Sequence, residues 1–260
     1  IDPFHLEAYG ETTVNYNRDV EIFPVVKAML ETIYGECPYK SPTDMGVNMV
    51  GNCIVDDEVC REASNQEIIR RYYQGLCDCK RGVGSKETLF KLELIMKQAG
   101  LSVENRAVVN AALKREESTG HPAMAIQLDD GTIVTGKTSD LLGAASAALL
   151  NTLKVLGGIE HDLHWESPNA NEPIQRLKTD YLGSRNPRLH TDEILIALSA
   201  SAASDSNAEL AMVQIPKLKG LEAHSSVLLS SVDEQVFKRL GIHLTSEAKY
   251  ETENKVYHKR

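Results

Sequence analysis

Residues 131–138 form the first stretch whose residue types and spacing could do chemistry. They read G-T-I-V-T-G-K-T, which fits the phosphate-loop pattern G-x-x-x-x-G-K-[ST] at every position. In such a loop, consecutive backbone N–H groups and the lysine bind the phosphates of a nucleotide. The four residues between the glycines are all β-branched, however, and β-branched residues favour extended backbone. Because Asp130-Gly131 is also a hairpin-turn signal, we predict a hairpin with strands at 123–128 and 132–135 rather than a nucleotide site.

The strongest candidate site is the loop 184–193, which reads S-R-N-P-R-L-H-T-D-E and leads into a predicted helix. Arg185 and Arg188 could bind an anion, because guanidinium groups near a helix start suit phosphate or carboxylate. His190 could act as an acid or base near neutral pH, and Asp192 is a second acid–base candidate. An exposed loop with a capping threonine would have the same sequence, so both interpretations stay open.

Residues 2–19 are a second polar segment with candidate residues, at the entrance of another predicted helix. An amide and a guanidinium at a helix start can hold a phosphate or a carboxylate. The candidates are Asn17 and Arg18 for the anion, with Asp2 and His5 for acid–base chemistry. A helix cap with a neighbouring ion pair would explain these residues equally well.

Residues 40–48 form a third polar loop, rich in residues that allow a ligand to approach the backbone closely. The candidates here are Lys40, Thr43 and Asn48 for binding and Asp44 for acid–base chemistry or Mg²⁺. Alone this loop is a weak signal. If the three loops meet in one cleft, they would bind a small-molecule substrate.

No zinc site is predicted. Cys77 and Cys79 are separated by one residue, whereas structural zinc sites use C-x₂-C with a second pair at a defined distance. His161 and His164 lie near acids, but they follow two glycines and are typical of a solvated loop. The five cysteines show no disulfide framework, which favours a reducing, cytoplasmic setting.

The overall composition narrows the classes of partner. The chain has 260 residues, 42% of them hydrophobic, and a formal net charge of −9. An acidic chain has no general attraction for nucleic acid or anionic membrane surfaces, so neither is expected as a partner. The sequence has no run of about 18 apolar residues, so no membrane-spanning helix is predicted.

The elements that must position these loops divide into two domains and a tail. Residues 1–118 are predicted to be mainly helical, with helices at 19–35, 56–80, 86–98 and 102–117. Residues 119–250 alternate strands and helices, which is typical of a small layered α/β domain. After the hairpin, its helices are predicted at 141–156, 172–182, 191–204, 206–215 and 233–240, with strands at 221–230 and 242–250. Ser139 or Asp140 is expected to cap the first of these helices, and residues 251–260 are predicted to be a tail.

Several strings along the chain resemble one uncharacterised bacterial family, the domain-of-unknown-function family 1846. They include IDPFHLEAYG, YKSPTDMGVN, QEIIRRYY, TGKTSDLLGA and NPRLHTDE. The resemblance implies a longer protein whose N-terminal part is similar to nucleotide-binding domains. Since the chain starts abruptly at Ile1, we interpret it as the C-terminal half of such a protein. The zinc-protease label sometimes attached to the family has no support here, because H-E-x-x-H is absent.

The predicted elements indicate a mixed α+β and α/β fold, a helical domain followed by a small three-layer α/β domain. The same resemblance implies a cytidine-deaminase-like topology for that second domain. Deaminases hold zinc with residues at the start of the helix after the hairpin. Here the matching stretch is Gly143–Ala147, which offers neither a zinc ligand nor a glutamate, and P-C-x-x-C is absent. If the fold is deaminase-like, its zinc chemistry is gone.

Two functional hypotheses follow. In the first, the chain is the substrate-binding part of a nucleotide-dependent enzyme of the phosphoryl-transfer or hydrolase type. Nucleotide and Mg²⁺ would then be held mainly by the absent N-terminal part. In the second, the chain is a non-catalytic module for binding or homo-oligomerisation. The two are distinguished by whether the three polar loops converge in one pocket.

Overall fold

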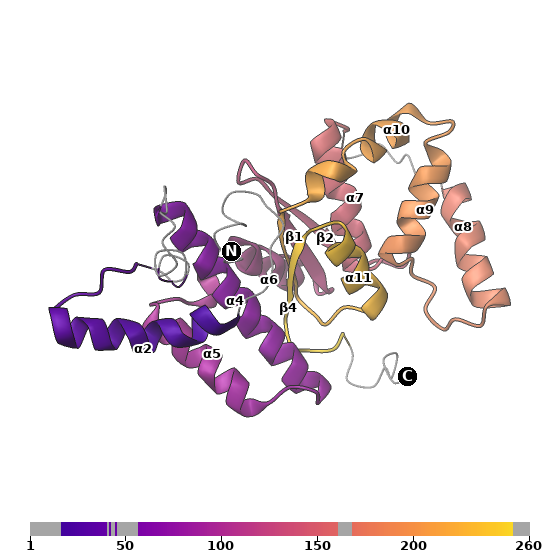
Figure 1. The fold of residues 1–260 in the computed structure, drawn as a ribbon. Coiled ribbons are helices and arrows are strands. Elements are labelled where there is room, and N and C mark those ends of the chain that lie inside the picture. The colour runs from indigo at the N-terminus through magenta and orange to yellow at the C-terminus, as the bar shows by residue number, and fades with distance from the viewer. Residues whose placement is uncertain (1–16, 41, 43–44, 46–56, 161–167, 252–260) are drawn as a thin grey trace. The chain divides into compact units, whose positions relative to one another are not determined.

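The chain folds into two compact units, residues 1–106 and 107–260 (Figure 1). The computed structural model describes residues 17–40, 42, 45, 57–160 and 168–251. The helix Ala107–Thr119, which the sequence places in the helical domain ending at 118, belongs to the second unit. Each unit has its own buried residues, so each is described separately below.

The described part of the first unit is helical, as predicted. Its elements are α2 (Asn17–Tyr34), α4 (Asp57–Arg81), α5 (Lys86–Gln98) and the short 3₁₀ helix η1 (Val103–Asn105). Helix α5 has the predicted bounds because the Ser85 side chain accepts a hydrogen bond from the N–H of Glu87 and so caps it. Helices α4 and α5 pack together, and both contribute buried apolar side chains, among them Ile69 and Ile95.

A four-stranded sheet organises the second unit. Its strands are β1 (Ala123–Gln127), β2 (Ile133–Lys137), β3 (Glu222–Ser225) and β4 (His243–Ser246), in the spatial order β2-β1-β3-β4. Strand β1 is antiparallel to β2 and to β3, whereas β3 and β4 are parallel. Strands β2, β3 and β4 therefore run in one direction, so the segments that follow them emerge at the same edge of the sheet.

Helices cover both faces of this sheet. Side chains alternate along β1, so Met124 and Ile126 pack into the core beside α7 (Ala144–Gly157), while Ala125 packs beside α6 (Ala107–Thr119). The α7 side also carries residues from several further helices. They are α9 (Thr191–Ser201), α10 (Ser206–Met212), η3 (Ile215–Leu218) and α11 (Ser231–Arg239). A mixed α/β unit is thus confirmed.

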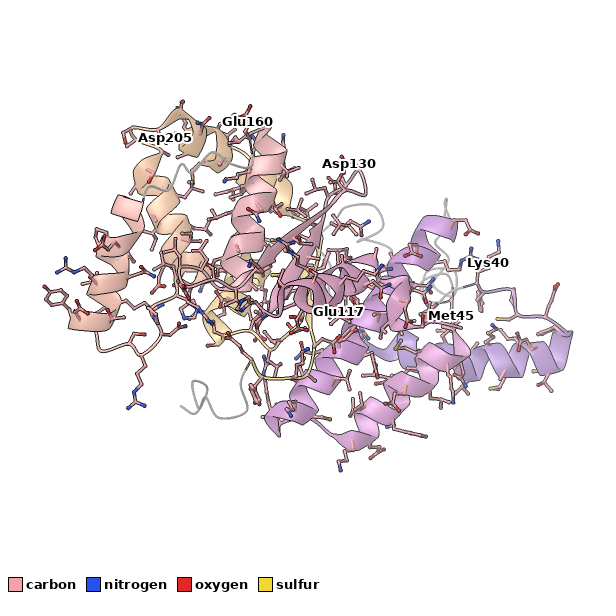
Figure 2. All side chains as sticks on the ribbon, turned by 180° about the vertical axis from the view of Figure 1, so that it is seen from behind. Lys40, Met45, Glu117, Asp130, Glu160 and Asp205 are labelled. Carbon is pink, nitrogen blue, oxygen red and sulfur yellow. The ribbon has the colours of Figure 1, made fainter. Side chains whose placement is uncertain are left out.

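The phosphate-loop pattern is a hairpin. Gly131 has a φ of 85° in the turn, and the N–H of Leu128 donates to the carbonyl of Thr132 at 2.8 Å. Strand β2 pairs with β1 in the register Val134 opposite Ile126. Figure 2 shows Asp130 at the tip of this hairpin, where its Oδ1 accepts a hydrogen bond from the N–H of Thr132. The predicted hairpin is confirmed.

The connection from the hairpin to α7 differs from the prediction. Strand β2 continues to Lys137, and α7 begins at Ala144 with Gly143 as its N-cap, three residues later than predicted. Ser139 does not cap the helix; its Oγ accepts hydrogen bonds from the N–H groups of Leu141 and Leu142. The serine hydroxyl therefore stabilises a turn ahead of the helix, and the predicted helix cap was wrong.

The last two strands are shorter than predicted. Strand β3 ends at Ser225, whose Oγ donates to the carbonyl of Val227 at 2.7 Å and accepts from its N–H at 3.3 Å. The N–H of Ser226 still donates to the carbonyl of Ala123, and the turn takes residues 227–230 out of the sheet. Strand β4 likewise ends at Ser246 rather than Tyr250. The residues released from both strands become loops at the carboxyl edge of the sheet.

The segment before α9 also departs from a regular helix. Helix α8 (Pro168–Arg176) is followed by the π-helical turn η2 (Leu177–Tyr181), where a single helix at 172–182 is predicted. A π turn repositions the side chains that follow it and is frequent at functional sites. Here it carries Lys178, which is almost fully buried.

Candidate functional site

A cavity of about 740 Å³ lies at the carboxyl edge of the sheet in the second unit. The segments that follow the three co-directional strands all line it: Thr138 after β2, residues 227–233 after β3, and Tyr250 and Glu251 after β4. The loop 184–190 closes another side. In open α/β sheets, ligands bind outside the carboxyl ends of the strands, so the position alone makes this cavity the candidate site.

Leu189 anchors the loop 184–190 to the start of α7. Its N–H donates to the carbonyl of Leu141 at 2.9 Å, and its carbonyl accepts from the Oγ of Ser146 at 3.0 Å. Leu142 and Leu189 also form a parallel β-bridge. The Leu189 side chain is fully buried in the core. A loop predicted from its polar residues is thus held by its buried leucine.

Lys178 fixes the backbone on both sides of Leu189. Its Nζ donates to the carbonyl of Arg188 at 2.6 Å and to Oε2 of Glu193 at 2.7 Å. The same carboxylate oxygen accepts a hydrogen bond from the N–H of His190 at 2.8 Å. A lysine is rarely buried unless it is paired. Lys178 and Glu193 therefore set the backbone position of His190 in the cavity wall.

His190 and Asp233 form the central pair of the cavity. The Nδ1 of His190 lies 3.1 Å from Oδ2 of Asp233, although the two residues are 43 positions apart in sequence. Oδ1 of Asp233 accepts two hydrogen bonds from Thr191, one from its N–H and one from its hydroxyl, both at 2.9 Å. The carboxylate is thereby fixed. It in turn orients the imidazole ring, whose Nε2 makes no hydrogen bond with any residue that the structure describes.

The pair shifts the acidity of both groups. The hydrogen bond to Asp233 raises the pKa of His190 above its usual value of 6.5; burial and Lys178 oppose this, while the charges of Asp233 and Glu193 add to it. Burial alone would raise the pKa of Asp233. The hydrogen bond and charge of His190, with hydrogen bonds from Thr191 and Ser230, instead hold it below its usual 3.8. An imidazolium facing a carboxylate is therefore favoured at mildly acidic pH.

Ser230 completes this cluster but is not placed as a nucleophile. Its Oγ donates to Oδ2 of Asp233 at 2.7 Å and accepts from the N–H of Asp233 at 3.2 Å, which caps α11. It approaches His190 only at Nδ1, at 3.4 Å, on the side of the ring that already faces Asp233. In a serine-histidine-aspartate triad the serine and the aspartate use opposite ring nitrogens. Ser230 therefore orients the carboxylate.

Arg185, Arg188 and His190, all predicted from the sequence, lie together in the cavity wall. Arg188 pairs with Glu251 at 2.5 Å. Arg185 is exposed and forms no ion pair within the part of the chain that the structure describes. Asp192 is not among the cavity residues; it is exposed, and its Oδ1 accepts a hydrogen bond from the N–H of Glu193. The carboxylate that faces His190 is Asp233 instead.

The other predicted residues are not brought to this cavity. Lys40 is exposed in the first unit. Asn17 and Arg18 begin α2, but their side chains are not described. Asp2, His5, Thr43, Asp44 and Asn48 lie outside the described residues. Whether the three polar loops converge in one pocket therefore stays an open question.

Sequence reasoning missed Asp233, Ser230, Lys178 and Thr138. Ser230 to Asp233 reads S-S-V-D, an [ST]-x-x-[DE] signal that marks the start of a helix. That signal could have placed Ser230 and Asp233 at a helix cap. Nothing local indicates that the carboxylate faces His190, because the direction of the strands decides which loops meet.

The expectation of no zinc site concerns residues that are only partly described. Among the described residues, no group of three or more His, Cys, Asp or Glu lies close enough to hold a metal ion. Cys77 is buried within α4, as expected of a small apolar residue. His161 and His164 lie outside the described residues. No helix found in the described segments is long and apolar enough to cross a membrane.

Comparison with known proteins assigns the family. The C-terminal model of the domain of unknown function DUF1846 matches residues 104–257, and the N-terminal model matches residues 1–100. The chain therefore belongs to the DUF1846 family. A match to the N-terminal model means that the predicted absence of the family's N-terminal part is not borne out.

The relatives are bacterial proteins of the UPF0371 group. One from Corynebacterium efficiens is 56% identical over 260 residues, which is 100% of this chain and 52% of the relative. One from Corynebacterium urealyticum is 55% identical over 250 residues, covering 96% of this chain and 50% of the relative. One from Streptococcus thermophilus is 54% identical over 259 residues, covering 100% and 52%. The chain thus spans about half the length of these curated relatives.

Proposed function

We propose that the second unit is the substrate-binding part of an enzyme, with His190 as its general acid or base and a small anion as its substrate. The observation that carries this proposal is the His190–Asp233 pair in the wall of the cavity. Asp233 holds Nδ1, so Nε2 is the nitrogen left for a substrate. A ring nitrogen with a fixed tautomer and a pKa near the working pH is what general acid–base catalysis requires.

The two arginines support an anionic substrate. Arg185 lines the cavity without an ion-pair partner among the described residues, and Arg188 is held beside the cavity by Glu251. A guanidinium can bind a phosphate or carboxylate through two parallel hydrogen bonds. Placed beside His190, this group would hold the substrate while Nε2 exchanges a proton with it.

The nucleotide remains part of the proposal. The enzyme would be nucleotide-dependent, of the phosphoryl-transfer or hydrolase type, cytoplasmic and homo-oligomeric, with Mg²⁺ bound by acids outside the second unit. The topology of the second unit would be cytidine-deaminase-like without zinc. The strand order β2-β1-β3-β4 with β1 reversed supports that topology.

Lys137 should play no part in binding nucleotide. It ends β2 opposite Ala123, is exposed, and is not among the residues of the cavity. Lys137→Ala is expected to leave the dissociation constants of ATP and GTP with Mg²⁺ unchanged within about twofold, since surface substitutions away from a site have small effects. Isothermal titration of the variant beside the wild-type protein measures this. A tenfold loss of nucleotide affinity would restore the phosphate-loop interpretation of 131–138.

The acid–base role is tested by titrating the imidazole of His190 by NMR, using ¹⁵N shifts of the ring. We expect a pKa above 6.5 and, in the neutral form, a proton on Nδ1, because Asp233 accepts from that nitrogen. Asp192→Asn is the matched control: it removes a neighbouring carboxylate that does not face His190 and should leave the titration nearly unchanged. A pKa at or below 6.5, or a proton on Nε2, would contradict the proposal.

A non-catalytic module for binding or homo-oligomerisation is the alternative, and one observation favours it. In the first unit, α2 and α5 line a groove of about 850 Å³ with largely exposed apolar side chains, including Val25, Met29 and Leu94. Exposed apolar surface of this kind often marks an interaction site. Two results together would favour this alternative: loss of self-association in a Met29→Lys variant, and a His190 pKa at or below 6.5.

A further inference from the structure

The start of α7 lies buried in the cavity wall, and no side chain caps it. Its N-cap is Gly143, which has no side chain to accept a hydrogen bond, and Ala144 and Ala145 are both buried. Within the described residues, the first helical N–H with a backbone acceptor is that of Ala147, which bonds to the carbonyl of Gly143. A buried helix start without acceptors is unusual, because each unpaired N–H loses its hydrogen bond to water.

Thr138 presents a second unsatisfied donor at the same place. Only 4% of the residue is exposed, and it lines the same cavity as Gly143, Ala144 and Ala145. Its N–H donates to the carbonyl of Pro122, but its hydroxyl makes no hydrogen bond with any described residue. The hydroxyl oxygen is not among the fully buried side-chain atoms that lack a partner, so it opens into the cavity. Since polar groups of nearly buried residues normally have a hydrogen-bond partner, an unpartnered hydroxyl facing the cavity beside this helix start points to a ligand that supplies the acceptor.

Gly143 keeps this place open. Its φ of −70° is available to every residue, so the backbone does not require glycine there. A Cβ built on Gly143 would meet no atom within 4 Å. The glycine is therefore explained neither by conformation nor by close packing. Its effect is that no side chain projects over the N–H groups of Ala144 and Ala145 on the cavity side.

The charged side chains around the start of α7 are largely paired with one another, so they do not repel an entering anion. Arg188 is paired with Glu251, and His190 with Asp233, so these four groups balance one another. Arg185 and Asp140 also line the cavity, and both are exposed. The positive end of the α7 dipole and the buried donors are therefore what an entering group meets.

We propose that the start of α7 and the hydroxyl of Thr138 form a phosphate subsite, which binds the phosphate group of the substrate. This inference rests on the proposed function, since it names the anion that His190 would face. A phosphate group offers three acceptor oxygens and up to two negative charges. The N–H groups of Ala144 and Ala145, the Thr138 hydroxyl and a guanidinium that donates twice from Arg185 could supply about five hydrogen bonds, whereas the two oxygens of a carboxylate accept about four.

Phosphate binding by the whole chain tests the subsite. Inorganic phosphate, methyl phosphate and acetate are titrated into ¹⁵N-labelled protein, and the amide signals of Ala144 and Ala145 are followed. Both phosphates are expected to move these two amide protons downfield in a saturable way, and acetate is expected to bind at least tenfold more weakly. Lys137→Ala, which alters the exposed lysine of the same G-K-T stretch, is the matched control and should bind phosphate like the wild-type protein.

Two variants test whether Thr138 and Gly143 bind phosphate or only stabilise the fold. Thr138→Val keeps the shape and removes the hydroxyl, so phosphate should bind roughly tenfold more weakly. Gly143→Asp places a carboxylate over the helix start, where it can cap Ala145 or Ser146. It should abolish phosphate binding without lowering the melting temperature, because aspartate is a good N-cap. Unchanged phosphate binding in both variants, or no saturable shift at Ala144 and Ala145 in the wild-type protein, would overturn the subsite.

The outcomes for the subsite and for the proposed function are distinguishable. Phosphate binding at α7 is read from two amides, whereas the acid–base role is read from the ring nitrogens of His190. If phosphate binds saturably but the pKa of His190 is at or below 6.5, the subsite is supported and the acid–base proposal is contradicted. Equal affinity for acetate and phosphate would overturn the assignment of phosphate, whatever His190 does.

Discussion

Replacing Gly136 by alanine is expected to destabilise the second unit more than the same change at any other described glycine of that unit. A Cβ on Gly136 would lie 2.1 Å from the N of Ala148 and 2.6 Å from the carbonyl carbon of Ala147. These are backbone atoms in the middle of α7, so no side chain can rotate away. Helix α7 would have to move off β2, and the core around Leu149 and Leu153 would open.

The free energy of unfolding should fall by about 3 kcal/mol or more, at the upper end of what overpacking costs. That is a large part of the total stability of an ordinary domain. Urea unfolding followed by circular dichroism measures it. Gly143→Ala is the matched control, since the added Cβ meets nothing within 4 Å and φ is −70°; its effect should stay within about 1 kcal/mol. A Gly136→Ala protein as stable as this control would contradict the packing of β2 on α7.

Replacing Asp233 by asparagine should have the second largest effect. The carboxylate accepts hydrogen bonds from Thr191 on one oxygen and from His190 and Ser230 on the other. An asparagine has only one carbonyl oxygen, so its NH₂ group must face two of these donors. Losing charged hydrogen bonds and leaving buried donors unpaired should cost about 2–3 kcal/mol of unfolding free energy near pH 6. Asp192→Asn is again the exposed control.

The size of this loss should depend on pH in a definite direction. The pKa of His190 is raised in the folded protein, so its contribution is fully present below 6.5 and disappears as pH rises through the folded pKa. The pKa of Asp233 is lowered, so its contribution is present above 3.8 and disappears as pH falls through the folded pKa. The difference between wild type and variant is therefore largest between these limits and shrinks at pH 8.5. Urea unfolding at pH 5.5, 7 and 8.5 tests the sign; a difference that grows with pH would show that the pair is not ionised as inferred.

Much of the secondary structure could be predicted from the sequence because its causes are local. Helix α5 begins after a capping serine and has the bounds that the sequence predicts. The β-branched run after Asp130-Gly131 predicts a hairpin rather than a phosphate loop, and the register of β1 and β2 confirms it. The helix and strand boundaries that were predicted wrongly also have local causes, but the pattern of apolar and turn residues does not show them. Ser139 and Ser225 use their hydroxyls to stabilise turns, so α7 begins later and β3 ends earlier than predicted.

The candidate site was only partly accessible to sequence reasoning. The loop with Arg185, Arg188 and His190 could be recognised from residue type and from its place before a helix. The carboxylate partner of His190 was not predicted, because sequence patterns report only neighbours along the chain; Asp192 was predicted only as a separate acid–base candidate. Asp233 lies 43 residues further on, and it meets His190 because β3 runs in the same direction as β2, so the segment after β3 emerges at the edge where Leu141 holds the His190 loop.

The sequence by itself thus determined the helices, the hairpin, the family and the loop that carries His190. The helices, the hairpin and the loop follow from spacing, capping or turn chemistry within a few residues, whereas the family follows from the resemblance of strings such as NPRLHTDE. The tertiary structure decided that Asp233 orients His190 and that Lys178 binds the backbone of the loop at Arg188. It also decided that Thr138, the last residue of the phosphate-loop pattern, lines the cavity. These arrangements depend on the order and direction of four strands, which no local pattern specifies.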